Sequence, residues 1–141
     1  MDYVAKAKTI TKASTPKVWE AFTDPRIVKQ WLFGTDMEVT DWEVGGQITY
    51  RGMWEGKAYQ DKGTIKEIIP PNKLVTTYWS SSSGLPDSPE NYQVVTYELS
   101  TKGDETMVTI TQKGSKTKEQ AAHSEGNWKQ VLASMKKLLE Q

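Results

Sequence analysis

The 141-residue sequence contains no cysteine and only one histidine, His123. Without cysteine there can be no disulfide, no thiolate metal site and no thiol nucleophile. A lone histidine without clustered carboxylates is a poor metal ligand set, and it leaves no Ser-His-Asp arrangement to form. We therefore expect His123 to be a surface residue, and we predict no metal, no cofactor and no catalytic residue.

The sequence also lacks an excess of charge of either sign, because 18 Lys and Arg balance 18 Asp and Glu. A net charge of zero gives no electrostatic reason to bind nucleic acid or an anionic membrane surface. No apolar run reaches the length of a membrane span, and residues 1–10 show no apolar signal-peptide region. We expect a cytoplasmic protein with no nucleic-acid and no membrane partner.

Tryptophan and tyrosine are abundant, with six of each against two phenylalanines. Both bring a large apolar surface together with a polar group that needs a partner when buried. The 36% hydrophobic and 26% charged residues are ordinary for a globular protein, and the length suits one domain over residues 1–141. Such a chain has either a core with polar groups in it or a pocket lined by aromatic rings.

The first third of the chain predicts one strand and two short helices. Residues 3–12 alternate as in a strand. Thr15-Pro16 and Asp24-Pro25 then place a capping residue before a proline, which is typical of a helix start. Apolar side chains share one face of each helix: Val18, Trp19 and Phe22, then Ile27, Val28, Trp31 and Leu32.

Residues 36–112 read as strands throughout, because apolar residues alternate and Gly or Pro residues separate the runs. The expected strands cover 37–42, 47–54, 58–69, 73–79, 92–100 and 106–112. Gly63 inside one of them predicts a bulge or bend. The small and polar residues 80–91 predict a loop, of a length that either covers a site or is simply solvated.

The C-terminal segment predicts one long amphipathic helix. Thr117 and Gln120 form a capping box, and an apolar stripe follows at Trp128, Val131, Leu132, Met135, Leu138 and Leu139. The stripe is too short for a coiled coil, so it must pack on the sheet. Gly126 within this helix marks either a bend or a close approach of the backbone to a strand or ligand.

The order of strand, two short helices, six strands and a long helix resembles the START-like, or Bet v 1-like, helix-grip superfamily (SRPBCC). Short motifs resemble its branch named after the activator of Hsp90 ATPase homologue 1 (AHSA1). These are Val18-Trp19-Glu20-Ala21-Phe22-Thr23-Asp24-Pro25, Gln30-Trp31, Val44-Gly45-Gly46, Gly63-Thr64-Ile65-Lys66-Glu67-Ile68, and Gly126-Asn127-Trp128 followed by Leu132. The match spans essentially the whole chain, and the order and spacing make it specific.

This resemblance implies an α+β helix-grip fold. A seven-stranded curved antiparallel sheet would carry the C-terminal helix on its concave face, with a hydrophobic cavity between them. The superfamily includes lipid and sterol carriers, plant hormone receptors and aromatase/cyclase enzymes, so the fold does not define one function. Gln112 stands where this family often has histidine near the end of the last strand.

We expect a small hydrophobic or aromatic ligand in that cavity, oriented by tyrosine hydroxyls. The alternative is a filled core, in which the same aromatic rings occupy the space. The residues expected to line the cavity are Trp31, Ile48, Tyr50, Trp54, Tyr59, Tyr78, Tyr97, Gln112, Trp128, Leu132 and Met135.

Two other functions stay open. One is a stress-related or Hsp90-type chaperone-associated interaction protein, with Val75 and Trp79 as outward-facing apolar residues. The other is a cyclase- or hydrolase-like enzyme, which needs a carboxylate in the cavity within reach of a tyrosine hydroxyl. Asp61 and Glu67 fit that requirement by alternation, but a bulge near Gly63 would turn one or both outward, and we favour that outcome.

Overall fold

The structure is a computed structural model that describes residues 3–141, apart from the side chain of Trp54. Its strands are β1 (Tyr3–Thr11), β2 (Asp36–Val39), β3 (Gln47–Trp54), β4 (Lys57–Ile69), β5 (Lys73–Ser80), β6 (Gln93–Lys102) and β7 (Glu105–Ser115). Its α-helices are α1 (Thr15–Thr23), α2 (Pro25–Trp31) and α3 (Lys118–Leu139). Two 3₁₀ turns, η1 (Ser81–Ser83) and η2 (Pro89–Asn91), lie between β5 and β6.

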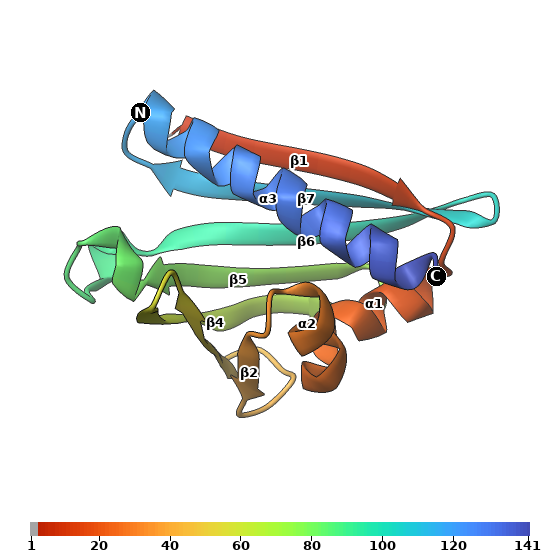
Figure 1. The fold of residues 1–141 in the computed structure, drawn as a ribbon, viewed down its shortest axis with the longest axis horizontal. Coiled ribbons are helices and arrows are strands. Elements are labelled where there is room, and N and C mark those ends of the chain that lie inside the picture. The colour runs from red at the N-terminus through yellow and green to blue at the C-terminus, as the bar shows by residue number, and fades with distance from the viewer. Residues whose placement is uncertain (1–2) are drawn as a thin grey trace.

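The strands of the described chain form one seven-stranded antiparallel sheet in the order β1-β7-β6-β5-β4-β3-β2. Consecutive strands from β2 to β7 pair as a meander, and β1 joins the far edge beside β7. The chain therefore has to cross from one edge of the sheet to the other between β1 and β2, and α1 and α2 make this crossing (Figure 1). The predicted α+β helix-grip architecture is confirmed.

The two short helices begin as their sequences predict, with one difference. Asp24 caps α2, and its carboxylate accepts a hydrogen bond from the Arg26 amide at 2.9 Å. In α1, Ser14 rather than Thr15 occupies the capping position. Thr15 is buried, and its hydroxyl lies 3.2 Å from that of Thr106 on β7, so this residue fixes the helix to the sheet instead.

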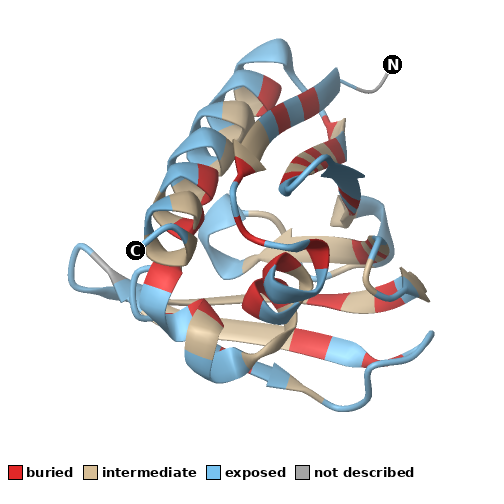
Figure 2. Ribbon diagram, turned by 90° about the vertical axis from the view of Figure 1, so that its right-hand side faces the viewer, coloured by how far each residue is buried: buried red, intermediate tan, exposed pale blue. Residues whose placement is uncertain are grey.

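The long helix α3 begins at the predicted capping box. The Thr117 hydroxyl accepts a hydrogen bond from the Gln120 amide at 3.0 Å, and the Gln120 side chain accepts one from the Lys116 amide at 2.7 Å. Leu132 and Met135 are fully buried, and the rest of the apolar stripe packs against the core. Figure 2 shows the buried residues of α3 on the side toward the sheet and the exposed ones on the opposite side. No helix in the described part of the chain is long and apolar enough to cross a membrane.

Aromatic contacts tie the helices together over the concave, inner face of the sheet. The Trp31 indole N–H donates to the Ala21 carbonyl at 2.8 Å, and the Phe22 and Trp31 rings meet edge to face at 5.6 Å. The Ser134 hydroxyl of α3 donates to the Trp31 carbonyl at 2.7 Å. Trp31 is thus the point at which α1, α2 and α3 meet.

Three details of the sheet differ from the expectation. Strand β2 ends at Val39 rather than at residue 42, because the following turn bonds to β4: the Ile65 amide donates to the Gly46 carbonyl. The predicted bulge is present, but it lies between Ile65 and Glu67 instead of at Gly63. Gly63 has another role, since a Cβ built there would lie 1.7 Å from the Thr77 carbonyl oxygen.

Gly126 does not mark a close approach to a strand. A Cβ built at this position meets nothing within 4 Å, and the helix runs without interruption from Lys118 to Leu139. The expected close approach of the Gly126 backbone to a strand is therefore wrong, and the helix is not broken at this residue.

These two glycines give a matched test of the fold. We expect Gly63→Ala to unfold at a much lower temperature than wild type, because its methyl group collides with the β5 backbone. We expect Gly126→Ala to gain about 1 kcal/mol of stability, because alanine is the better residue inside an exposed helix. Thermal and denaturant unfolding of both variants measures this, and equal effects of the two substitutions would contradict it.

Candidate functional site

The inner face of the sheet has two distinct halves. Helix α3 runs diagonally, in contact with β1 and β7 near its start and with α2 toward its end (Figure 1). Beneath its second half lies the packed apolar core. At the other end, where α3 begins, several inner-face residues of β3 to β6 are polar and only half-buried. We call these residues, with the buried Gln112 of β7, the inner-face polar cluster: Tyr50, Asp61, Tyr78, Ser80, Gln93 and Gln112.

Strand register brings the cluster together. Residues directly opposite each other in an antiparallel pair share a face of the sheet. Asp61 is paired with Tyr50 on one side and with Ser80 on the other, which makes a row across β3, β4 and β5. Tyr78, two residues before Ser80, is paired with Gln93 on β6 and so continues the same face.

Asp61 is the only carboxylate in the cluster. The Tyr78 hydroxyl donates to its Oδ2 at 3.0 Å, and the Ser80 hydroxyl donates to its Oδ1 at 2.5 Å. Burial raises the pKa of Asp61 above its ordinary value, and the hydrogen bonds from Ser80 and Tyr78 offset only part of this. The carboxyl therefore holds its proton more readily than an exposed aspartate does.

The expectation that one or both candidate carboxylates would turn outward is met by one of them. Glu67 faces the outer side, because the bulge after Ile65 puts it opposite Val75, and it pairs there with Lys73 at 3.4 Å. Asp61 does not turn outward. The bulge lies on the far side of Gly63, so alternation keeps Asp61 on the inner face.

A second hydrogen-bonded row ends on α3. The Trp128 indole N–H donates to Gln112 Oε1 at 2.7 Å, and Gln112 Nε2 donates to Gln93 Oε1. The Trp128 ring also meets Tyr97 edge to face at 5.8 Å. An amide both accepts and donates, so Gln112 satisfies both neighbours at once.

The tyrosines of this region stay neutral. Burial raises the pKa of Tyr50 to about 12, although the hydrogen bond it accepts from Tyr97 acts in the opposite direction. Burial also raises the pKa of Tyr97 well above its ordinary value. The pKa of Tyr78 is raised by burial and by the neighbouring Asp61 carboxylate. All three phenols therefore keep their protons at physiological pH, and the Tyr78 hydroxyl donates a hydrogen bond to Asp61.

The structure divides the predicted cavity residues between the two halves. Core positions are taken by Trp31, Ile48, Tyr97, Leu132 and Met135, all of which are buried. Tyr50 and Tyr78 belong to the cluster and Trp128 lies beside it, and all three are half-buried. Gln112 is buried and engaged, Tyr59 shares a hydrogen bond with the Thr35 hydroxyl, and the Trp54 side chain lies outside the described residues.

Sequence reasoning missed Ser80 and Gln93. Ser80 was assigned to the following loop, although it stands two residues after Tyr78 and so shares its face. Gln93 opens β6 and gave no apolar signal. Extending the alternation of β5 by one residue would have included Ser80. Gln93 can be assigned to the cluster only once the pairing of β5 with β6 is known.

Two hollows on the outer face of the sheet are separate from the cluster. One, of about 480 Å³, lies among Lys6, Lys8, Lys73, Glu98 and neighbouring residues. The other, of about 340 Å³, is bordered by Thr49, Lys62, Thr64, Thr77 and Tyr92 among others. Both are lined by lysine and hydroxyl groups rather than by aromatic rings, apart from Tyr92.

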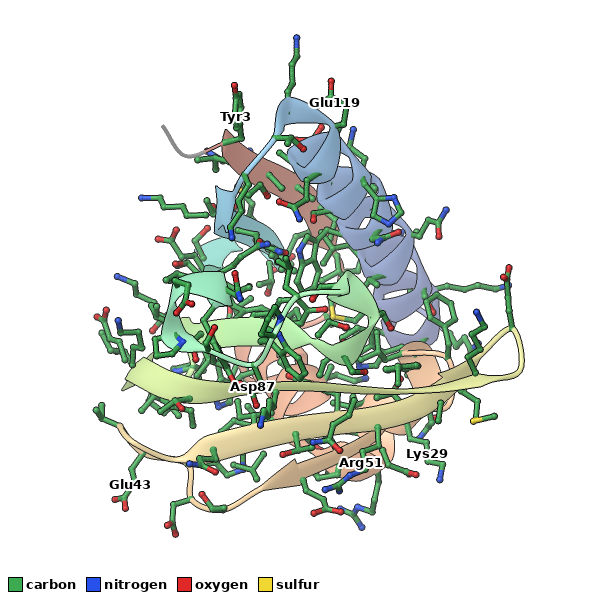
Figure 3. All side chains as sticks on the ribbon, turned by 90° about the vertical axis from the view of Figure 1, so that its left-hand side faces the viewer. Tyr3, Lys29, Glu43, Arg51, Asp87 and Glu119 are labelled. Atoms are coloured by element: carbon green, nitrogen blue, oxygen red, sulfur yellow. The ribbon has the colours of Figure 1, made fainter. Side chains whose placement is uncertain are left out.

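The outward residues Val75 and Trp79 do not form an exposed apolar patch. Both lie on the outer face as predicted, but both are half-buried. The loop between β5 and β6 folds over Trp79: its indole N–H donates to the Leu85 carbonyl at 3.2 Å, and its ring stacks on Tyr92 at 6.4 Å. Figure 3 shows Asp87 of this loop in front of the strands, where it pairs with Lys62.

Metal-ligating side chains do not gather in the part of the chain that the structure describes: no group of three or more His, Asp or Glu could hold an ion there. His123 lies on the exposed side of α3, as expected.

The family model described as activator of Hsp90 ATPase homolog 1-like protein matches residues 12–140. The chain therefore belongs to this family, as the sequence motifs indicated. No curated protein matches the chain.

Solved structures share the fold. The protein ChR145 from Cytophaga hutchinsonii is 42% identical, with a TM-score of 0.83 over 98% of this chain and 94% of that one. The Aha1 dimer from Colwellia psychrerythraea is 21% identical, with a TM-score of 0.73 over 98% and 96% of the two chains. DynU16, a putative protein in the dynemicin biosynthetic locus, is 19% identical, with a TM-score of 0.77 over 98% of this chain and 47% of that one. The last two likenesses concern the fold alone.

The raised pKa of Asp61 predicts how its removal changes stability. A folded-state pKa above the unfolded value means that stability falls as pH rises between the two values, because ionisation costs more in the folded protein. We expect Asp61→Asn to be more stable than wild type near neutral pH, with the advantage disappearing as the solution is acidified. Unfolding temperatures of both proteins over a pH series measure this. A less stable variant at neutral pH would show that Asp61 is a structural group.

Proposed function

We propose that this protein binds a small aromatic or hydrophobic molecule that carries a polar group, over the inner-face polar cluster. The ligand lies between the first half of α3 and strands β3 to β5. The observation that carries the proposal is the row formed by Tyr50, Asp61 and Ser80, which face inward and yet are only half-buried.

Such exposure is unusual for the concave face. Elsewhere on that face, side chains such as Ile48 and Val95 lie buried in the core. Titratable groups with shifted pKa values are concentrated at functional sites, and small-molecule sites combine aromatic and apolar walls with a few polar groups. The Asp61 carboxylate is partly buried and its pKa is raised, so its ionised form is less favourable here than in solvent.

The chemistry of the cluster defines the kind of ligand. Aromatic surface comes from Tyr50, Tyr78 and Trp128, and each is only partly buried. Hydrogen-bonding capacity comes from the Asp61 carboxylate and from the neutral tyrosine hydroxyls. A molecule with one ring and one polar group would use both, whereas a long lipid chain would need far more apolar lining than this half of the face provides.

A pair of tyrosine variants tests the location. Tyr78→Phe removes a hydroxyl that donates to Asp61 on the inner face. Tyr92→Phe removes a hydroxyl that donates to Asp87 on the outer face, at 2.6 Å. A compound that raises the unfolding temperature of wild type should raise that of Tyr92→Phe equally and that of Tyr78→Phe less, in a thermal screen of small aromatic molecules.

Tyr92→Phe is a matched control for Tyr78→Phe, because each variant loses one hydroxyl that is hydrogen-bonded to one aspartate. If no compound stabilises wild type, or if the two variants respond alike, the proposed site is wrong. Recovering the bound compound and weighing it by mass spectrometry tells binding from turnover.

Turnover is the second candidate, because a carboxylate on the inner face lies within reach of a tyrosine hydroxyl. A half-exposed carboxylate with a raised pKa lies 3.0 Å from a neutral tyrosine hydroxyl. This pair could move a proton to or from a bound molecule. A cyclase- or hydrolase-like reaction would appear as a changed mass in the wild-type sample and an unchanged mass with Asp61→Asn.

Association with a chaperone is the other alternative, drawn from the family description. The sequence offered Trp79 as an exposed apolar contact for such a partner, but the loop between β5 and β6 covers its ring. A cytoplasmic location stays a prediction of the sequence.

A further inference from the structure

We infer that the group recognised by the inner-face polar cluster is a cation, such as the protonated amine of a small aromatic molecule. This inference rests on the proposed function and names its ligand class. The feature that carries it is the Asp61 carboxylate, which faces inward beside two aromatic residues and has only hydroxyl groups as partners.

Asp61 has no positive partner of its own among the described residues. None of the ion pairs in residues 3–141 includes it. Its sequence neighbour Lys62 points to the outer face, where it pairs with Asp87 and lies 5.6 Å from the centre of the Trp79 ring. Arg51 is engaged with Glu38 at 2.7 Å on the same outer side of the sheet. A charge that the protein leaves uncompensated is available to a ligand.

The carboxylate also has free acceptor capacity. An ionised carboxylate offers about four lone-pair sites, two on each oxygen. Tyr78 uses one site on Oδ2, and Ser80 uses one on Oδ1. About two sites therefore remain for a ligand donor, and an ammonium group carries two or three N–H donors that can use them.

The neighbouring side chains favour a cation in a second way. Tyr50 is paired directly with Asp61, and Tyr78 contacts it through its hydroxyl. A cation near aromatic rings gains from the negative face of the ring, and the gain grows as water is excluded. The cluster itself contains tyrosine, serine, glutamine and aspartate but no lysine, arginine or histidine. An anionic ligand would therefore meet the Asp61 charge with nothing to neutralise its own.

Three probes of nearly the same shape and different charge test the inference: 2-phenylethylamine, 2-phenylethanol and 3-phenylpropanoate. Calorimetric titration at neutral pH measures their binding to the whole chain. A charge-assisted hydrogen bond is stronger than a neutral one, so the amine should bind about tenfold tighter than the alcohol. The carboxylate probe should bind most weakly.

Two variants separate the role of Asp61 from general charge effects. Asp61→Asn should remove the advantage of the amine, so that this variant binds the amine no more tightly than the alcohol. Asp87→Asn removes an outer-face carboxylate with the same formal charge and should keep the order of the three probes.

The possible outcomes distinguish a failure of the cation preference from a failure of the proposed ligand binding. If the alcohol binds and the amine binds no better, or if the anion binds most tightly, the cation preference is wrong while ligand binding stands. An amine preference that survives Asp61→Asn would also overturn the inference. If none of the probes and no compound of the aromatic screen binds, the proposed function fails and the inference fails with it.

Discussion

The pairing register of β3, β4 and β5 is the constraint on which the site depends. Antiparallel pairing places Tyr50, Asp61 and Ser80 in one row, and a slip of one residue would turn every one of them to the outer face. The bulge between Ile65 and Glu67 is compatible with this row because it comes after Asp61 along β4. Gly63 lies between the row and the bulge, where the β5 backbone leaves no room for a side chain.

Helix α3 crosses the sheet diagonally, and its course decides which inner-face residues it buries. Its second half carries Leu132 and Met135, which close the apolar core completely. Its first half stays near β1 and β7 (Figure 1), and at that end the inner-face residues Tyr50, Asp61 and Ser80 are half-buried rather than buried. The same sheet therefore has a packed apolar region beneath the second half of α3 and a half-buried polar region toward the start of α3. Of the two expectations for this face, the filled core describes the half beneath the second half of α3, and the cavity stays a prediction.

Much of the fold could be predicted because its signals are local. Alternation gave most strands to within a few residues, the Asp24-Pro25 pair gave the start of α2, and the capping box gave the start of α3. Thr15 was misassigned because its hydroxyl is used by β7, a contact that no local pattern contains.

The candidate site was predictable only in part, because it depends on contacts between distant segments. The aromatic residues were found from composition and alternation. The inward position of Asp61 depends on where the bulge falls, which the sequence of β4 does not determine. Gln93 joins the cluster through the pairing of β5 with β6 and through Gln112. The resemblance to the family gave the architecture but not the division of its inner face.

We have proposed that a ligand binds over the inner-face polar cluster, beside the first half of α3. An NMR titration with a compound that stabilises the protein tests it most directly, by mapping which backbone amides shift. The account predicts shifts at Tyr50, Asp61, Tyr78 and Gln93 and along the first half of α3 near Trp128. Shifts confined to Lys8, Lys73 and Thr109, around the larger outer hollow, would contradict it.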